Sequence, residues 1–138
     1  MKTVLLAAAA TLAFAGQAAA ADPAGLWQTP TNAGQVEISH CGNSLCGKLV
    51  TSSRIQANPA IKDGENHDKG LRDRPLKGLQ MLYDFTGGPT KWTGGKVYNP
   101  DDGGTYSGTI QMTSADSLKL KGCIVAPLCK TQVWTRVK

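Results

Sequence analysis

The chain has 138 residues, of which 41% are apolar and 18% are charged, and it carries a net charge of +5 at neutral pH. This length suits one domain with a modest core. The basic residues are scattered rather than clustered, which argues against a nucleic-acid partner. Past the N-terminus no segment is long and apolar enough for a bilayer span, so the protein is not expected to be membrane-spanning.

The N-terminal segment has the three-part order of a secretory signal peptide. Lys2 supplies positive charge, residues 4–15 form an apolar run, and small residues lead to a cleavage site after Ala21. A membrane anchor is the alternative, but the run is shorter than the roughly 20 residues that a span needs. The residue directly after the cleavage site is Asp22, not the cysteine that lipoprotein processing would require. We predict a leader over residues 1–21 and a periplasmic or secreted domain over residues 22–138.

Cys41, Cys46, Cys123 and Cys129 all follow the predicted leader. An even number of cysteines in an exported chain indicates disulfides, and four cysteines allow three pairings. We favour Cys41 with Cys46 and Cys123 with Cys129, because each pair brackets a short segment that resembles a hairpin turn. The alternative is a metal site that includes His40. An oxidising compartment and the lack of a second nearby histidine disfavour it, so no metal is predicted.

The domain reads as short strands separated by turns, and no stretch of ten or more residues has a convincing apolar period of 3.6. Eight strands are expected, over residues 25–29, 35–41, 46–51, 79–85, 91–99, 105–113, 118–123 and 129–137. Sequential hairpins at this spacing predict an all-β fold, an eight-stranded antiparallel barrel. A barrel is favoured because closure leaves no strand edge unpaired.

The connection over residues 52–78 is the longest irregular segment. Its charged residues between Asp63 and Arg74 can bind a polar ligand or a cation, or they can hydrogen-bond to their own loop, which we favour. Asp101 and Asp102 resemble a catalytic carboxylate pair, but the glycine that follows them is typical of a hairpin turn. No catalytic or phosphate-binding motif is present, so no cofactor is predicted and an enzyme is the least favoured class.

The two ends of the domain carry a matching pair of residues. Gly25 and Trp27 begin the first expected strand, and Trp134 and Arg136 lie in the last. In a closed barrel these strands are neighbours, so Arg136 is expected to lie across the indole of Trp27, an interaction worth about 0.5–2 kcal/mol. The pair resembles the Gly-x-Trp start and late arginine of lipocalins.

A longer ordered set of motifs extends over residues 25–137. It comprises KDGENHD at 62–68, LRDRPLKGL at 71–79, WTGGKVYNPDDG at 92–103, TY at 105–106, LKLKG at 118–122 and WTR at 134–136. Together these motifs resemble the DUF2147 family, exported bacterial proteins of unassigned function. The resemblance implies a lipocalin-like barrel and no particular activity. His67 stands where the pattern Asp-x-x-Asn-Pro-Asp has proline.

Two functions suit such a barrel, which can either leave room for one ligand or fill with side chains. It can bind a small apolar or amphipathic molecule without catalysis, the function we favour. Otherwise it is a structural or interaction module of the cell envelope, with an envelope protein or a second copy as partner. Alternation predicts that Leu79, Met81, Tyr83 and Phe85 share an inward face.

The same pattern predicts the candidate ligand-binding residues. Tyr106, Ile110 and Met112 share a second inward face. Residues 52–78 are expected to cover the mouth, because long irregular loops often act as lids or binding loops. Two arginines of that loop would hold an acidic head group. The candidates are therefore Arg72, Arg74, Met81, Tyr83, Tyr106 and Met112.

Overall fold

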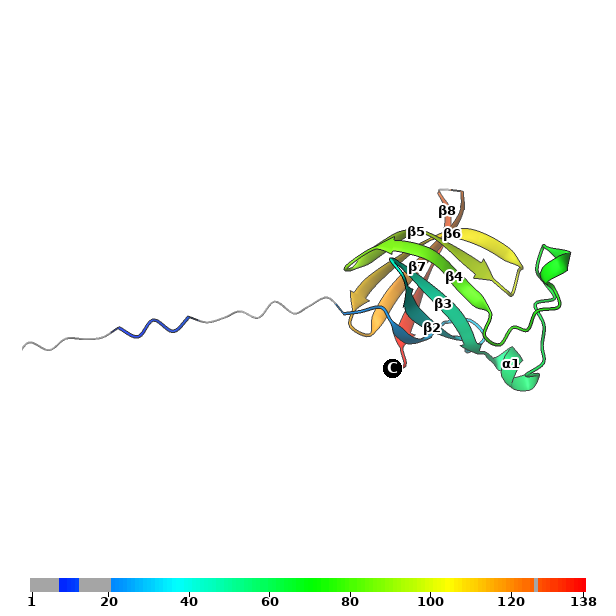
Figure 1. Ribbon diagram of the computed structural model, residues 1–138, viewed down its shortest axis with the longest axis horizontal. Coiled ribbons are helices and arrows are strands. Elements are labelled where there is room, and N and C mark those ends of the chain that lie inside the picture. The colour runs from blue at the N-terminus through cyan, green and yellow to red at the C-terminus, as the bar shows by residue number, and fades with distance from the viewer. Residues whose placement is uncertain (1–7, 13–20, 126) are drawn as a thin grey trace, which may run out of the picture.

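The computed structural model describes residues 8–12, 21–125 and 127–138 (Figure 1). Most of the predicted leader, residues 1–21, lies outside the described residues. The elements are β1 (Gly25–Gln28), β2 (Gln35–Cys41), β3 (Ser44–Thr51), α1 (Ser53–Ala57), η1 (Lys69–Leu71), β4 (Gln80–Gly87), β5 (Lys91–Asn99), β6 (Gly104–Ser114), β7 (Ser117–Val125) and β8 (Leu128–Arg136).

Each strand pairs antiparallel with the next along the chain, and β8 pairs with β1, so the sheet closes into a barrel. The predicted eight-stranded antiparallel barrel is confirmed. At the closing seam Trp27 lies opposite Arg136 and Gln28 opposite Thr135. The β1–β2, β3–β4, β5–β6 and β7–β8 connections all lie at one end of the barrel, here called the loop end. The other end, the termini end, holds the remaining turns, the start of β1 and the end of β8.

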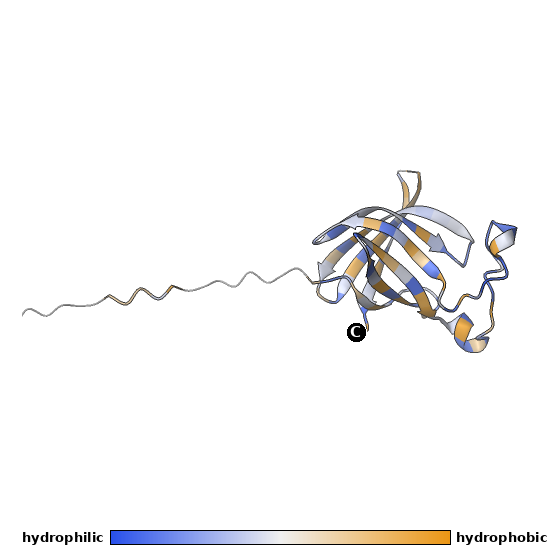
Figure 2. Ribbon diagram, viewed as in Figure 1, coloured by the Kyte–Doolittle hydropathy of each residue, from blue (hydrophilic) through white to orange (hydrophobic). Residues whose placement is uncertain are grey.

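Hydrophobic residues alternate with hydrophilic ones along the strands (Figure 2), and the buried apolar side chains form a core inside the barrel. Trp27, Trp134 and Phe85 are the largest fully buried side chains, and Ile110 and Leu118 are also fully buried. The loop end of the barrel is bordered by the polar connections between strands.

Two glycines make room for the largest ring in that core. The ring of Phe85 lies against Gly95 and Gly108, where any added Cβ atom would collide with it. The close approach explains why strands β5 and β6 carry glycine at these inward positions.

Strand β4 departs from the predicted alternation. Leu82 and Phe85 both face the interior, although they are three positions apart and strict alternation would place them on opposite faces. Asp84 between them adopts the left-handed conformation, with φ of 58°, which shifts the alternation by one residue. Tyr83 therefore lies on the outer wall beside Lys96, its partner on β5. The prediction that Leu79, Met81, Tyr83 and Phe85 form one inward face is wrong for this reason.

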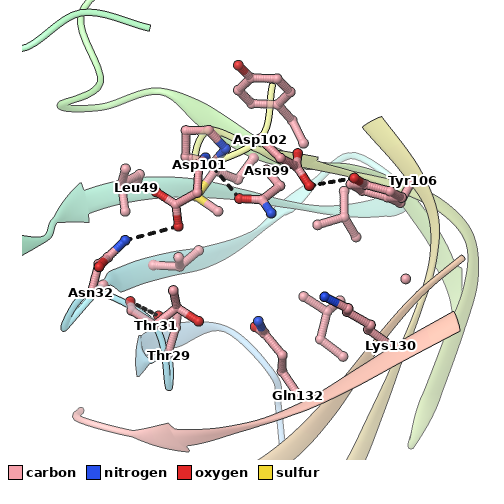
Figure 3. Close-up of a pocket in the computed structure, with 18 of the residues that line it drawn as sticks. Thr29, Thr31, Asn32, Leu49, Asn99, Asp101, Asp102, Tyr106, Lys130 and Gln132 are labelled. Atoms are coloured by element: carbon pink, nitrogen blue, oxygen red, sulfur yellow. Dashed lines mark hydrogen bonds between the residues drawn. The ribbon is translucent and has the colours of Figure 1, made fainter. Parts of the chain in front are cut away.

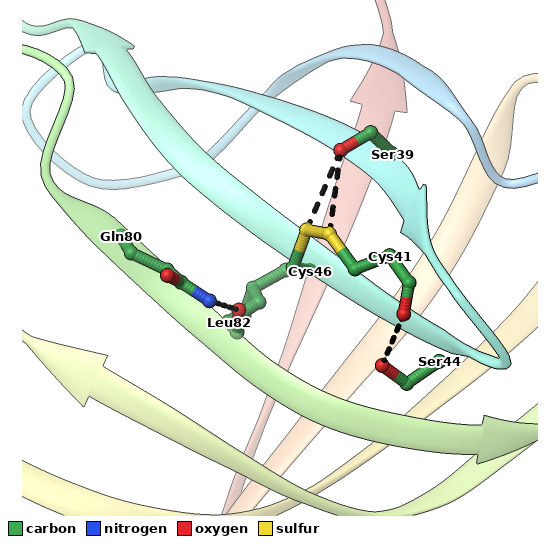
Figure 4. The surroundings of a disulfide bond; sticks show 6 residues. All are labelled: Ser39, Cys41, Ser44, Cys46, Gln80 and Leu82. Carbon is green, nitrogen blue, oxygen red and sulfur yellow. Dashed lines mark hydrogen bonds between the residues drawn. A yellow bond between two sulfur atoms is a disulfide. The ribbon is translucent and has the colours of Figure 1, made fainter.

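Two disulfides join neighbouring strands. Cys41 is bonded to Cys46 within the β2–β3 hairpin, and Cys123 to Cys129 within the β7–β8 hairpin. In Figure 4 the hydroxyl of Ser39 lies next to the first disulfide, 3.4 Å from the Cys46 sulfur. Each hairpin is thus cross-linked close to its turn.

The connection between β3 and β4 is held against the outside of the barrel. Its buried Asp63 accepts hydrogen bonds from Arg74 Nε at 2.9 Å, from Asn66 Nδ2 at 2.9 Å and from the hydroxyl of Tyr98 on β5. His67 Nε2 lies 3.0 Å from the carbonyl oxygen of Asp102 in the β5–β6 turn. Residues 58–75, all of them described, do not line the cavity of the barrel. The expectation that the whole connection covers the mouth is therefore wrong.

Candidate functional site

A cavity of about 480 Å³ opens at the loop end of the barrel. Its deeper wall is apolar, and it is formed by Val36, Leu49, Val97, Leu120 and Trp134 from five different strands. Ligand pockets in proteins typically occupy about 300–1,000 Å³. The cavity is thus large enough for one small molecule.

The mouth of the cavity is polar, in contrast to its depth. The polar residues of the mouth are Thr29, Thr31, Asn32, Ser52, Arg54, Asn99, Asp101, Asp102, Tyr106, Lys130 and Gln132. Figure 3 shows that they come from opposite walls, with the β5–β6 turn facing β8 across the opening. A molecule that fills this cavity contacts apolar side chains at its inner end and hydrogen-bonding groups at its outer end.

The two carboxylates of the mouth are bonded to neighbouring groups. Asp101 accepts hydrogen bonds from Asn32 Nδ2 at 3.0 Å and from Arg54 Nη1 at 3.2 Å. Asp102 accepts from the hydroxyl of Tyr106 at 2.5 Å and from the backbone N–H of Gly104 at 2.8 Å. These contacts hold the β5–β6 turn, in agreement with the turn interpretation of the sequence.

The bond to Asp102 raises the pKa of Tyr106, and burial adds to the shift. Tyr106 therefore keeps its proton at neutral pH and is held with its ring at the mouth. The hydrogen bond to Asp102 thus fixes the positions of both side chains at the mouth.

Lys130 and Gln132 face the cavity from β8, and sequence reasoning missed both. Gln132 Oε1 accepts a hydrogen bond from Trp134 Nε1 at 3.0 Å, which turns its amide nitrogen toward the opening (Figure 3). In the described part of the chain Lys130 forms no ion pair. The sequence pattern did contain a signal for both residues. In a strand, residues two and four positions before an inward-facing tryptophan share its inward face.

The predicted ligand-binding residues lie at three separate places. Met81 and Tyr106 line the cavity. Met112 is buried at the termini end, opposite Leu118, and does not line the cavity. Tyr83 and Arg74 line a second hollow, of about 530 Å³, on the outer wall beneath the connection.

Both arginines expected at the mouth are bonded elsewhere. Arg72 Nε donates to the carbonyl oxygen of Asn66 at 2.8 Å. Arg74 is paired with Asp63 and lies over the ring of Tyr98, 5.3 Å from its centroid. Burial lowers the pKa of Arg74, but the bond and charge of Asp63 outweigh it and raise the pKa overall. Arg72 and Arg74 therefore hold the connection in place and do not reach the cavity.

Trp27 and Arg136 meet at the termini end. The Arg136 guanidinium carbon lies 4.4 Å from the centroid of the Trp27 ring. Gly25 lies beneath them with φ of 145°, where an added Cβ atom would be 2.5 Å from Arg136 Nη1. This contact requires glycine two residues before the tryptophan, and it places the pair far from the cavity mouth.

Two further properties of the described residues bear on function. They contain no helix of the length and hydropathy needed to cross a bilayer. Among the same residues no group of three or more His, Cys, Asp or Glu side chains is arranged to hold a metal ion.

A closed eight-stranded barrel with a cavity at one end and a stacked Trp–Arg pair at the other defines a lipocalin-like protein. The model of the family described as "Uncharacterized protein conserved in bacteria (DUF2147)" matches residues 25–136. The chain belongs to the DUF2147 family.

A solved structure supports the same class. It is that of HP1028 from the human pathogen Helicobacter pylori, described as belonging to the lipocalin family. The two chains are 26% identical, with a TM-score of 0.76, and the match covers 86% of this chain and 84% of HP1028. No curated protein matches the chain. The fold and family fit a small-ligand-binding barrel in general.

Proposed function

We propose that the protein binds one small amphipathic molecule in its barrel and releases it chemically unchanged. The observation that carries this proposal is the cavity of about 480 Å³, apolar in its depth and polar at its mouth. An apolar chain would lie against Leu120 and Trp134, and a polar head group would remain at the mouth. The cavity supports this function over the interaction-module alternative, which calls for an interior filled with side chains.

The side chains of β8 favour a negatively charged head group. Lys130 offers an ammonium group and Gln132 an amide nitrogen at the same side of the mouth. The carboxylates of Asp101 and Asp102 already accept hydrogen bonds from Arg54 and Tyr106. An anionic group can therefore pair with Lys130 without displacing an existing ion pair.

Three ligands with the same chain and different head groups test this function. The purified protein is delipidated and titrated with dodecanoate, dodecanol and dodecylamine while its melting temperature and tryptophan fluorescence are followed. Trp134 lines the cavity, so its emission reports occupancy. We expect dodecanoate to raise the melting temperature most, in a concentration-dependent way. Lys130→Glu should reverse the preference toward dodecylamine.

Gly122 offers a way to block the cavity without disturbing the backbone. It faces the interior, and an added Cβ atom would meet nothing nearer than Tyr106 Cβ, at 3.5 Å. Gly122→Phe should fill the cavity and abolish binding while the barrel stays folded. Gly64→Phe is the matched control, because Gly64 is exposed on the outer connection with no atom within 4 Å of an added Cβ. Equal ligand binding by the Gly122→Phe variant and the parent would contradict the proposal.

We also propose that the protein acts after export. Its two disulfides and its membership of a bacterial family are compatible with this location. Mass spectrometry of the protein from the periplasm or medium is expected to find Asp22 as its first residue. A chain that retains residues 1–21 would contradict the predicted leader.

A further inference from the structure

The end of the β7–β8 hairpin carries an exposed apolar cluster next to the cavity. Ile124 is 70% exposed, Val125 is 64% exposed and Leu128 is 66% exposed. We call these three residues the tip. Figure 1 shows that this hairpin projects beyond the neighbouring strands. Adjacent apolar side chains this exposed indicate an interaction surface rather than scattered surface residues.

The tip is held in position before any partner arrives. Val125 pairs with Leu128 across the hairpin, and the Cys123–Cys129 disulfide lies directly behind them. A surface that is already ordered loses less conformational entropy on binding.

The two strands that carry the tip are basic. β7 and β8 contain Lys119, Lys121, Lys130 and Arg136 and no acidic residue. Lys119 and Lys121 are exposed on the outward face of β7. Lys121 is three residues from Ile124, a separation of about 10 Å along a strand. Lys121 would therefore lie near the level of the lipid phosphates when the tip enters the acyl boundary.

We propose that the tip inserts into the surface of a bilayer that contains anionic phospholipid, with Lys119 and Lys121 contacting the phosphates. These two lysines are here called the basic collar. A projecting apolar tip with a basic collar suits a fluid surface, whereas a protein partner would need a pocket shaped to receive it. Ile124 and Leu128 also line the mouth of the cavity. Insertion would therefore bring the cavity mouth to the membrane, where amphipathic molecules reside.

Vesicle flotation tests the docking. Vesicles of phosphatidylcholine alone are compared with vesicles that also contain phosphatidylglycerol. We expect binding to the anionic vesicles, weakened by salt. Val125→Asp should weaken it at least about tenfold, because burial of an apolar side chain is lost. Val125 does not line the cavity, so ligand binding should be retained. Val137→Asp is the matched control, since Val137 is 47% exposed just beyond the end of β8, at the termini end of the barrel.

The basic collar is tested separately. Lys121→Glu should weaken binding to anionic vesicles about fivefold or more. Lys91→Glu, an exposed lysine at the start of β5 near the termini end, should have no comparable effect. Equal losses in the two variants would show that overall charge, and not the collar, attracts the protein, and would overturn this part of the proposal.

A tryptophan placed at the tip reports insertion directly. The three native tryptophans are buried, so Leu128→Trp adds the one exposed indole of the described residues. Its emission should shift to the blue with anionic vesicles, and lipids brominated on the acyl chain should quench it. An unshifted emission, or self-association in the absence of vesicles that Val125→Asp abolishes, would overturn membrane docking. Gly122→Phe should still bind vesicles, which separates docking from ligand uptake.

Discussion

Arg136 connects the last strand to the beginning of the domain through several contacts of one guanidinium group. It stacks on Trp27, and its nitrogens donate to the carbonyl oxygens of Ala24 at 2.8 Å, Asp22 at 2.6 Å and Ala115 at 2.8 Å. The stacking and the fixed directions of the three donors both need a planar group. Lysine has the same charge and can supply neither in full.

We therefore expect Arg136→Lys to lower the free energy of unfolding by about 2 kcal/mol. Denaturant unfolding of the variant and the parent measures this change. Arg54→Lys serves as a control, because its exposed ion pair with Asp101 is expected to contribute about 0.5 kcal/mol. Equal effects of the two substitutions would show that stacking on Trp27 contributes little.

Tyr98 gives the domain a sensitivity to alkaline pH. Burial raises its pKa well above the usual value near 10, and the hydrogen bond to Asp63 adds to the shift. The folded protein therefore keeps this proton at a pH where the unfolded chain has lost it. The contribution to stability is complete below about pH 10 and declines as the pH rises further.

Tyr98→Phe should accordingly lower the free energy of unfolding by about 1–3 kcal/mol at pH 7, because buried Asp63 loses a donor. The difference in the free energy of unfolding between the variant and the parent should shrink above pH 10. Urea unfolding of both proteins at several pH values measures this difference. Ile110→Val is the control, since it removes a buried methylene and its effect should not depend on pH. A constant difference for Tyr98→Phe would contradict the explanation.

At the scale of elements, each disulfide cross-links one hairpin over a short loop of five or six residues in sequence. A loop of this length stabilises by about 2 kcal/mol in the chain-entropy description. Replacing either pair with serine should lower the melting temperature and leave a folded barrel, as judged by thermal unfolding and circular dichroism. Loss of the fold in one double variant would show that its hairpin depends on the cross-link.

The strands were predictable because apolar alternation and turn residues both repeat along the chain. The inward face of strand β4 was not predictable, since the left-handed conformation of Asp84 leaves no mark in the apolar pattern. Arg74 was misplaced for a related reason. Charge density in a loop shows that arginines have partners, but only the structure shows that buried Asp63 is the partner of Arg74.

At the scale of the whole molecule, the barrel followed from sequential hairpins and the family resemblance, whereas the cavity did not. Whether inward side chains fill a barrel depends on how they pack across it. Met112 and Tyr106 share one strand face, yet Met112 packs in the core and Tyr106 lines the mouth. Lys130 was overlooked because a lysine in a strand is normally solvated on the outer face.

The closing seam of the barrel also sets the order in which the chain can fold. The other seven strand pairings join consecutive segments, so each hairpin can form as soon as its second strand has been made. The pairing of Trp27 with Arg136 must wait until Arg136 has been synthesised. Until then β1 and β8 both present unpaired edges, which another chain can capture. The interval between the seventh pairing and the eighth is therefore when this protein is most exposed to strand exchange with a second copy.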